Sequence, residues 1–194
     1  MDEPASFWDD RYREGNTPWD FGGVPPEFLN WLHRTPRPGK VLVPGCGSGY
    51  ELRALAETGA DPTGLDLSTE AVKRARATLG ERNGRVLAGD FFTHPFSHGE
   101  FDAVYERTFL CALDPLLRTD YARRMAQLLK PGGLLAGFFL FGHEPEPPPH
   151  PLAAGGDHEL FDLYFEKIES VPTRHTLPIF AGFEERWQVW RKRT

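Results

Sequence analysis

The hydrophobic positions of the chain alternate between short, mostly apolar runs and stretches with helical spacing. Apolar runs bounded by turn residues are typical of buried strands, and they predict strands at 40–43, 61–66, 85–91, 101–106 and 134–141. Apolar residues three and four positions apart predict helices between these strands, at 51–59, 69–79 and 116–129. Strands that alternate with helices predict an α/β fold whose parallel sheet is covered by helices on both faces.

The first 39 residues do not follow this alternation. Trp8 and Tyr12 lie one turn apart in a predicted helix at 6–15, a turn-rich link carries Trp19, and a second helix is predicted at 25–34. We therefore expect a single domain, residues 1–194, in which residues 1–39 are an N-terminal segment packed on the sheet.

The C-terminal part combines a loop with a further helix and two strands. A proline-rich loop is predicted at 143–155, followed by a short helix near 157–165 and by two strands, the last around 186–192. Trp187 and Trp190 alternate poorly across that last strand, so we expect one in the core and one partly exposed.

Composition narrows the class of partner. A net charge of −6 and a pI of about 5.6 argue against nucleic acid as the main binding partner. The sequence contains no run of about 18 apolar residues, so it predicts no membrane-spanning helix. The acidic N-terminus lacks the apolar core of a signal peptide. Cys46 and Cys111 match no disulfide or zinc spacing, and the histidines show no metal pattern, so we expect a cytoplasmic protein without a metal. The aromatic content of 13%, with five Trp, indicates a ligand site.

The loop "GCGSG", residues 45–49, follows the first predicted strand of the sheet. Gly45 allows the turn, Gly47 and Gly49 let backbone approach a ligand, and Cys46 fits as a small side chain in the same turn. The dinucleotide fingerprint needs a glycine where Tyr50 stands, and no Gly-Lys-Ser/Thr of a P-loop follows. The glycines alone also allow a simple strand-to-helix turn.

Two acidic residues favour a ligand. Asp66, followed by Leu67, ends the second predicted strand and suits the two ribose hydroxyls of a nucleoside, while Ser68 suits the N-cap of the next helix. Asp90 ends the third predicted strand, where its carboxylate suits the exocyclic amine of adenine, and Phe91 suits the ring. A ligand with adenosine but no required phosphate is S-adenosyl-L-methionine, which leaves as S-adenosyl-L-homocysteine.

Several stretches resemble a known family. "GCGSGYELRALAETGADPTGLDLSTEAV" is similar to motifs I and II of class I methyltransferases, and "FWDDRYREGNTPWDFGG", "VLVPGCGSG" and "YERTFLCAL" resemble the thiopurine S-methyltransferase family, close to its halide and thiol methyltransferase branch. The resemblance implies a Rossmann-like, seven-stranded, mostly parallel sheet with an antiparallel last strand. It also implies that the N-terminal segment is a helical cap over the cofactor site.

The resemblance implies a role for each matching residue. The cofactor set is Trp8, Tyr12, Trp19, Gly45, Cys46, Gly47, Gly49, Asp66, Leu67, Asp90, Phe91 and Arg107. Arg107 matches an arginine near the methionine moiety and substrate of the thiopurine enzymes, where the halide and thiol branch tends to have tyrosine. The family's acceptor loop is altered here, with Glu146 in place of glycine and His150 in place of an aromatic residue.

Arg107 and Glu106 are the candidate catalytic residues. A thiol is partly ionised near neutrality and needs no strong base, and Arg107 would favour a thiolate. Glu106 would accept a proton or simply fix Arg107. We expect a monomeric, S-adenosylmethionine-dependent methyltransferase that acts on a small thiol or sulfide and binds neither nucleic acid nor membrane. Methylation of nitrogen or oxygen in a small heteroaromatic metabolite, halide methylation and a non-catalytic cofactor-binding regulator remain as alternatives.

Overall fold

The structure is a computed structural model that describes residues 3–35, 38–144 and 147–194. Two compact units divide these residues, one formed by residues 3–95 and the other by residues 96–194. Pro145 and Glu146, in the proline-rich loop, lie outside the described residues.

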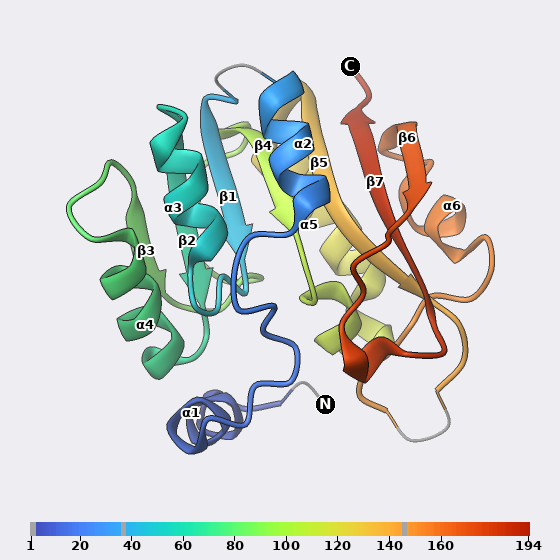
Figure 1. Cartoon of the computed structure of the whole chain (residues 1–194). Helices are drawn as coiled ribbons and strands as arrows, with labels where there is room; N and C mark the ends of the chain where they lie inside the picture. Colours follow the sequence, from blue (N-terminus) through green and yellow to red (C-terminus); the bar gives the residue numbers. More distant parts are fainter. Residues whose placement is uncertain (1–2, 36–37, 145–146) are drawn as a thin grey trace. The chain divides into compact units, whose positions relative to one another are not determined.

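The unit of residues 3–95 is built on the parallel strands β1 (Lys40–Pro44), β2 (Asp61–Asp66) and β3 (Arg85–Ala88). Its helices are α1 (Ala5–Glu14), α2 (Pro26–Arg34), α3 (Tyr50–Glu57) and α4 (Thr69–Leu79). The ribbons of α3 and α4 lie along these strands (Figure 1), and both helices contact β2. Val41, Leu42 and Val43 are all buried, because both faces of β1 are covered.

Close packing and capping fix the path from β1 to α4. A Cβ on Gly64 in β2 would lie 2.6 Å from Leu52 Cδ1 and 2.9 Å from Cys46 Sγ, so only glycine admits this approach of α3 and the loop to the strand. Ser68 is the N-cap of α4, as predicted, and its Oγ accepts a hydrogen bond from the Ala71 amide at 3.1 Å.

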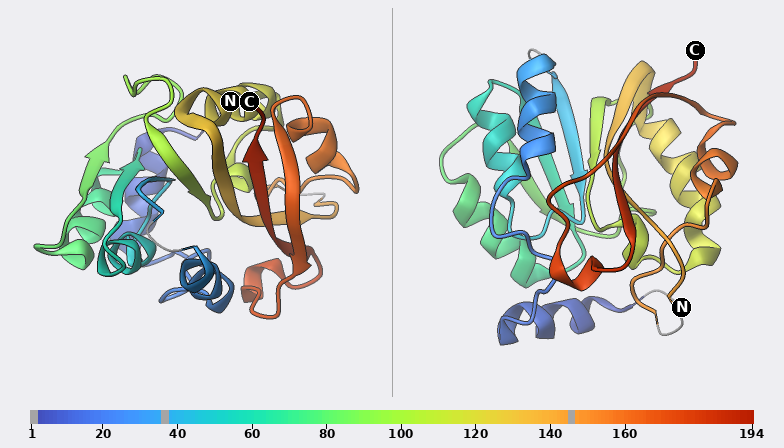
Figure 2. Two further views of the ribbon diagram at one scale, coloured as in Figure 1. Left: turned by 90° about the horizontal axis from the view of Figure 1, so that it is seen from above. Right: turned by 45° about the vertical axis from the view of Figure 1, so that its right-hand side comes forward.

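In the unit of residues 96–194, the described residues form the strands β4 (Phe101–Glu106), β5 (Leu129–Phe141), β6 (Phe165–Pro172) and β7 (Glu184–Lys192). β4 and β5 are parallel, whereas β7 is antiparallel to both β5 and β6. Its helices are α5 (Arg118–Leu128), α6 (Gly156–Phe161) and the 3₁₀ turns η1 (Leu110–Ala112), η2 (Pro115–Leu117) and η3 (Pro178–Phe180). Figure 2 shows α5 and α6 on the same side of β5, β6 and β7.

The described strands have the order β3-β2-β1-β4-β5-β7-β6. The prediction of an α/β fold with a seven-stranded, mostly parallel sheet and an antiparallel last strand is therefore confirmed.

Three local predictions are corrected. β3 ends at Ala88, so Asp90 lies in the following turn and not at the end of the strand. The helix predicted at 116–129 is split into η2 and α5, and Leu129 already belongs to β5. Trp187 and Trp190 are both buried, because β7 lies between β5 and β6 with side chains packed on each of its faces. Trp187 contacts Phe138 at a ring distance of 5.2 Å, and Trp190 contacts Phe161 at 5.1 Å.

Candidate functional site

The glycine loop, residues 45–49, joins β1 to α3. Gly45, Gly47 and Gly49 have φ values of +58°, +50° and +76°, in the left-handed region that favours glycine. The loop is tied to β2 by the hydrogen bond from the Cys46 amide to the Leu65 carbonyl, at 3.2 Å. Cys46 is buried, as expected for a small side chain in a tight turn. These contacts hold the loop backbone in one conformation at the carboxyl end of β1.

Asp66 ends β2 and joins this loop. Its Oδ2 accepts a hydrogen bond from the Gly47 amide at 2.9 Å, and its Oδ1 accepts one from the Ser68 amide, also at 2.9 Å. Burial raises the pKa of Asp66 to about 6, against the two amide hydrogen bonds, so the group is mainly ionised at neutral pH. Leu67 lies half-buried between Asp66 and Ser68. The structure thus brings the Asp66 carboxylate to the glycine loop.

Asp90 and Phe91 occupy the turn after β3. Asp90 Oδ1 accepts hydrogen bonds from the Phe92 amide at 2.7 Å and the Thr93 amide at 2.9 Å, so this carboxylate closes the turn. Phe91 is buried and packs edge-on against Phe92 at a ring distance of 5.2 Å. Sequence reasoning did not anticipate the turn-closing contacts of Asp90, because it extended β3 too far.

Trp8, Tyr12 and Trp19 form an aromatic cluster, the aromatic cap. The ring of Trp19 lies 5.4 Å from that of Trp8 and 6.2 Å from that of Tyr12, both edge-on, and Trp19 Nε1 donates to Tyr12 Oη at 3.5 Å. A Cβ on Gly47 would lie 2.9 Å from Tyr12 Oη, so the cap approaches the glycine loop more closely than a side chain at position 47 would allow.

A second contact joins the N-terminal segment to the glycine loop. Ser48 Oγ donates a short hydrogen bond to Asp20 Oδ2. The sequence did not predict Asp20 as a site residue, although it lies in the stretch "FWDDRYREGNTPWDFGG", because nothing in the sequence indicates which serine it contacts. The N-terminal segment and the loop are thus joined at Tyr12 and at Asp20.

Glu106 and Arg107 lie in the unit of residues 96–194, where Glu106 ends β4 and Arg107 follows it directly. Glu106 is 1% exposed; its Oε1 accepts hydrogen bonds from the amides of Phe109 and Leu110 at 2.9 and 3.0 Å, and its Oε2 accepts one from Tyr121 Oη at 2.6 Å. Burial raises the pKa of Glu106 to about 7, against these three donors. The contacts support the interpretation that Glu106 fixes the turn that carries Arg107.

Arg107 is itself mostly buried. Its guanidinium carbon lies 4.4 Å from the centroid of the Phe138 ring, a cation–π contact with β5. The next residue, Thr108, has a φ of +56°, an unfavourable conformation for a residue with a branched side chain. Strain of this kind persists only where surrounding contacts impose it, and Glu106 supplies such contacts.

Among residues 3–35, 38–144 and 147–194, no group of three His, Cys, Asp or Glu side chains is arranged to hold a metal ion. None of the helices in these ranges is both long and apolar enough to cross a membrane.

Comparison with known proteins identifies the family. The model of the family described as Thiopurine S-methyltransferase (TPMT) matches residues 3–192. The chain belongs to the thiopurine S-methyltransferase family. The predicted enzyme class, a methyltransferase of the S-adenosylmethionine-dependent kind, is confirmed by this membership.

Sequence relatives agree with this thiopurine S-methyltransferase family assignment. Probable thiol methyltransferase 2 of Arabidopsis thaliana is 34% identical over 190 residues, which cover 93% of this chain and 84% of the relative. Thiocyanate methyltransferase 1 of the same plant is 30% identical over 192 residues, 95% of this chain and 84% of the relative.

A solved structure supports the fold. The 1,6-didemethyltoxoflavin-N1-methyltransferase of Burkholderia thailandensis, with bound 1,6-didemethyltoxoflavin and S-adenosylhomocysteine, superposes with a TM-score of 0.79. The match covers 98% of this chain and 87% of that one at 20% identity, and it shows that this family member has the methyltransferase fold.

Proposed function

We propose that this protein transfers a methyl group from S-adenosyl-L-methionine to the sulfur of a small thiol. The observation that carries the proposal is the Asp66 carboxylate, which ends β2 and is hydrogen-bonded to Gly47 within the glycine loop. The names of two relatives, a probable thiol methyltransferase and a thiocyanate methyltransferase, support sulfur as the accepting atom.

The residues of the unit 3–95 fit S-adenosylmethionine. The ionised Asp66 carboxylate offers acceptor lone pairs suited to ribose hydroxyls, and the three left-handed glycines hold the adjoining loop backbone without side chains of their own. We propose that Asp90 and Phe91 contact adenine and that the aromatic cap contacts the cationic methionine end. An aromatic face stabilises a cation by about 0.5 to 2 kcal/mol. When bound, S-adenosylmethionine supplies an electrophilic methyl group on a sulfonium sulfur.

The acceptor side of the proposal rests on the charge of Arg107. Its guanidinium is permanently positive, so it favours the anionic form of an acceptor bound nearby. A free thiol has a pKa of about 8.5. A moderate lowering of this pKa in the acceptor therefore makes the thiolate abundant at neutral pH without a general base. In this proposal Glu106 holds the turn of Arg107 and does not take the proton. A small-molecule acceptor, a monomeric state and the absence of nucleic-acid and membrane partners belong to the same proposal.

Calorimetric titration with S-adenosylhomocysteine tests the cofactor assignment. Loss of a hydrogen bond to a charged group costs about 1.5 to 3 kcal/mol, so we expect Asp66→Ala to weaken affinity roughly 10- to 100-fold. Asp61→Ala is the matched control, because Asp61 begins the same strand and is exposed; it should leave affinity unchanged. Full affinity in Asp66→Ala would refute the ribose assignment.

A further inference from the structure

Asp9, on α1, contacts the first turn of α4. Its Oδ1 accepts hydrogen bonds from Ser68 Oγ at 2.6 Å and from the Glu70 amide at 3.1 Å, and its Oδ2 lies 3.3 Å from Thr69 Oγ1. The side chain of Asp9 is 13% exposed. A carboxylate from another helix thus satisfies an amide at the N-terminus of α4, where negative charge is favoured.

Ser68 connects this contact to the proposed cofactor site. Its hydroxyl donates to Asp9 and accepts from Ala71, while its backbone amide donates to Asp66 Oδ1. Asp66 in turn accepts a hydrogen bond from the Gly47 amide through its Oδ2. A continuous series of hydrogen bonds therefore runs from α1 through the start of α4 to the glycine loop.

The position of Asp9 on α1 links the same contact to the aromatic cap. Asp9 follows Trp8 directly and lies one turn before Tyr12, whose hydroxyl approaches Gly47. Arg74 of α4 donates a short hydrogen bond to the Tyr12 carbonyl and stacks over the Tyr12 ring at 5.2 Å. Helix α1 is thus held on α4 near both of its cap residues.

We propose that Asp9 is a positioning residue of the cofactor site, which orients the aromatic cap and the Asp66 segment together by binding the N-terminus of α4. This proposal rests on the function proposed above. The hydrogen bond from Ser68 is the largest influence that lowers the pKa of Asp9, so Asp9 stays ionised as an acceptor at neutral pH. The neighbouring Asp10 pairs with Arg13 and is 63% exposed, which makes it a matched control on the same helix.

The affinity for S-adenosylhomocysteine, measured by calorimetry, tests the proposal. We expect Asp9→Ala to weaken it about tenfold or more, and Asp9→Asn, which keeps one acceptor oxygen, by about threefold. Asp10→Ala should bind like the wild type. Unchanged affinity in Asp9→Ala, even with a lowered melting temperature, would show a purely structural role and overturn the proposal.

A double-mutant cycle with Trp8→Ala separates action through the cap from general loosening. If Asp9 acts in part through the cap, adding Asp9→Ala to Trp8→Ala should weaken affinity by a smaller factor than Asp9→Ala does in the wild type, whereas full additivity would overturn this route. Hydrogen exchange provides a second readout. Amides of α1 should gain protection on S-adenosylhomocysteine binding in the wild type. At saturating ligand the gain should be smaller in Asp9→Asn, which serves as the test variant if Asp9→Ala does not fold.

The wild-type titration distinguishes the two proposals. If the wild type does not bind S-adenosylhomocysteine, the proposed function fails and the inference on Asp9 fails with it. If the wild type binds and Asp9→Ala binds equally well, only the inference on Asp9 is refuted.

Discussion

At the scale of single residues, Glu106 links burial to pH-dependent stability. It holds its proton in the native state up to a pKa of about 7, whereas its ordinary value is 4.5. Between these values the native state binds more protons than the unfolded chain, so the free energy of unfolding falls as pH rises. Integrated over the shift, the loss is roughly 3 kcal/mol between about pH 4.5 and 7, with no further change above that window.

Glu106→Gln tests this expectation, because glutamine keeps an acceptor oxygen for the turn but does not titrate. Urea unfolding at pH 5 and at pH 8 should show that the free energy of unfolding decreases less between these pH values in Glu106→Gln than in the wild type. Asp66 also titrates in this range, and the difference between the two proteins cancels its contribution. Identical decreases in both proteins would show that Glu106 is ionised throughout.

Residue-level predictions from the sequence succeeded where the signal was local. The Ser68 cap and the position of Asp66 follow from the order of residues around one strand end. The side-chain partners of Glu106 and Asp9 could not be predicted in this way, because they are distant in the sequence. Tyr121 is fifteen positions from Glu106, and Ser68 is fifty-nine from Asp9. Contacts between distant elements depend on tertiary packing, which no local pattern records.

At the scale of elements, the approach of the N-terminal segment to the glycine loop predicts a specific cost at Gly47. Alanine at Gly47 or at Gly59 must adopt a positive φ, which costs each about 1 to 2 kcal/mol. At Gly47 the new Cβ also meets Tyr12 Oη at 2.9 Å, whereas at Gly59 nothing lies within 4 Å. Gly47→Ala should therefore lose more stability than Gly59→Ala and, unlike it, weaken S-adenosylhomocysteine binding. Equal affinities in the two variants, measured by calorimetry, would argue against the contact.

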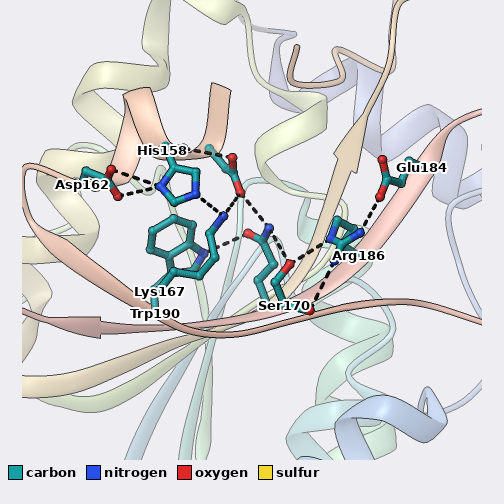
Figure 3. A network of polar contacts seen from close by, with 9 residues as sticks. His158, Asp162, Lys167, Ser170, Glu184, Arg186 and Trp190 are labelled. Carbon is teal, nitrogen blue, oxygen red and sulfur yellow. Dashed lines mark hydrogen bonds and ion pairs between the residues drawn. The ribbon is translucent and has the colours of Figure 1, made fainter. Parts of the chain in front are cut away.

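The polar network between α6, β6 and β7 predicts a second element-scale effect (Figure 3). Asp157 is 3% exposed, and its Oδ2 accepts hydrogen bonds from Lys167 Nζ at 2.6 Å and from Gln188 Nε2 at 2.7 Å. Removal of one partner of a buried pair leaves the other charge without compensation. We expect Asp157→Ala to reduce the free energy of unfolding by about 3 kcal/mol.

Asp162→Ala is the control for this network. Asp162 contacts His158 of the same network at 3.1 Å, but both side chains are about half exposed. Its loss should cost less than about 1 kcal/mol in the same denaturation experiment. Similar losses in Asp157→Ala and Asp162→Ala would mean that burial of Asp157 contributes little.

Hydrophobic periodicity predicted the existence and type of most strands and helices. It was wrong about where some of them end and about which of their faces are buried. β3 is shorter than its apolar run because Asp90 closes a turn with its own side chain. Both tryptophans of β7 are buried because α6 covers Trp190 and β5 supplies Phe138 against Trp187. The sequence of β7 alone does not show what packs on either face.

At the scale of the whole molecule, alternation of elements predicted the α/β class, while the seven strands and the antiparallel last strand followed only from family resemblance. The order of the strands was not predicted. The order β3-β2-β1-β4-β5-β7-β6 depends on pairings between segments far apart in the chain. The cofactor residues from Trp8 to Phe91 all fall in the unit of residues 3–95, and Glu106 and Arg107 fall in the other. The acceptor is the least predictable feature, because the altered proline-rich loop removes the family's pattern there.

The central claim is methyl transfer from S-adenosylmethionine to a thiol. Its most direct test incubates the purified protein with methyl-labelled S-adenosylmethionine and benzenethiol, thiocyanate or hydrosulfide, with phenol and aniline as oxygen and nitrogen controls. We predict that label passes to sulfur, that phenol and aniline stay unlabelled, and that Asp66→Ala loses most of the activity. Binding of S-adenosylhomocysteine without label in any sulfur product, or preferential labelling of phenol or aniline, would contradict the claim.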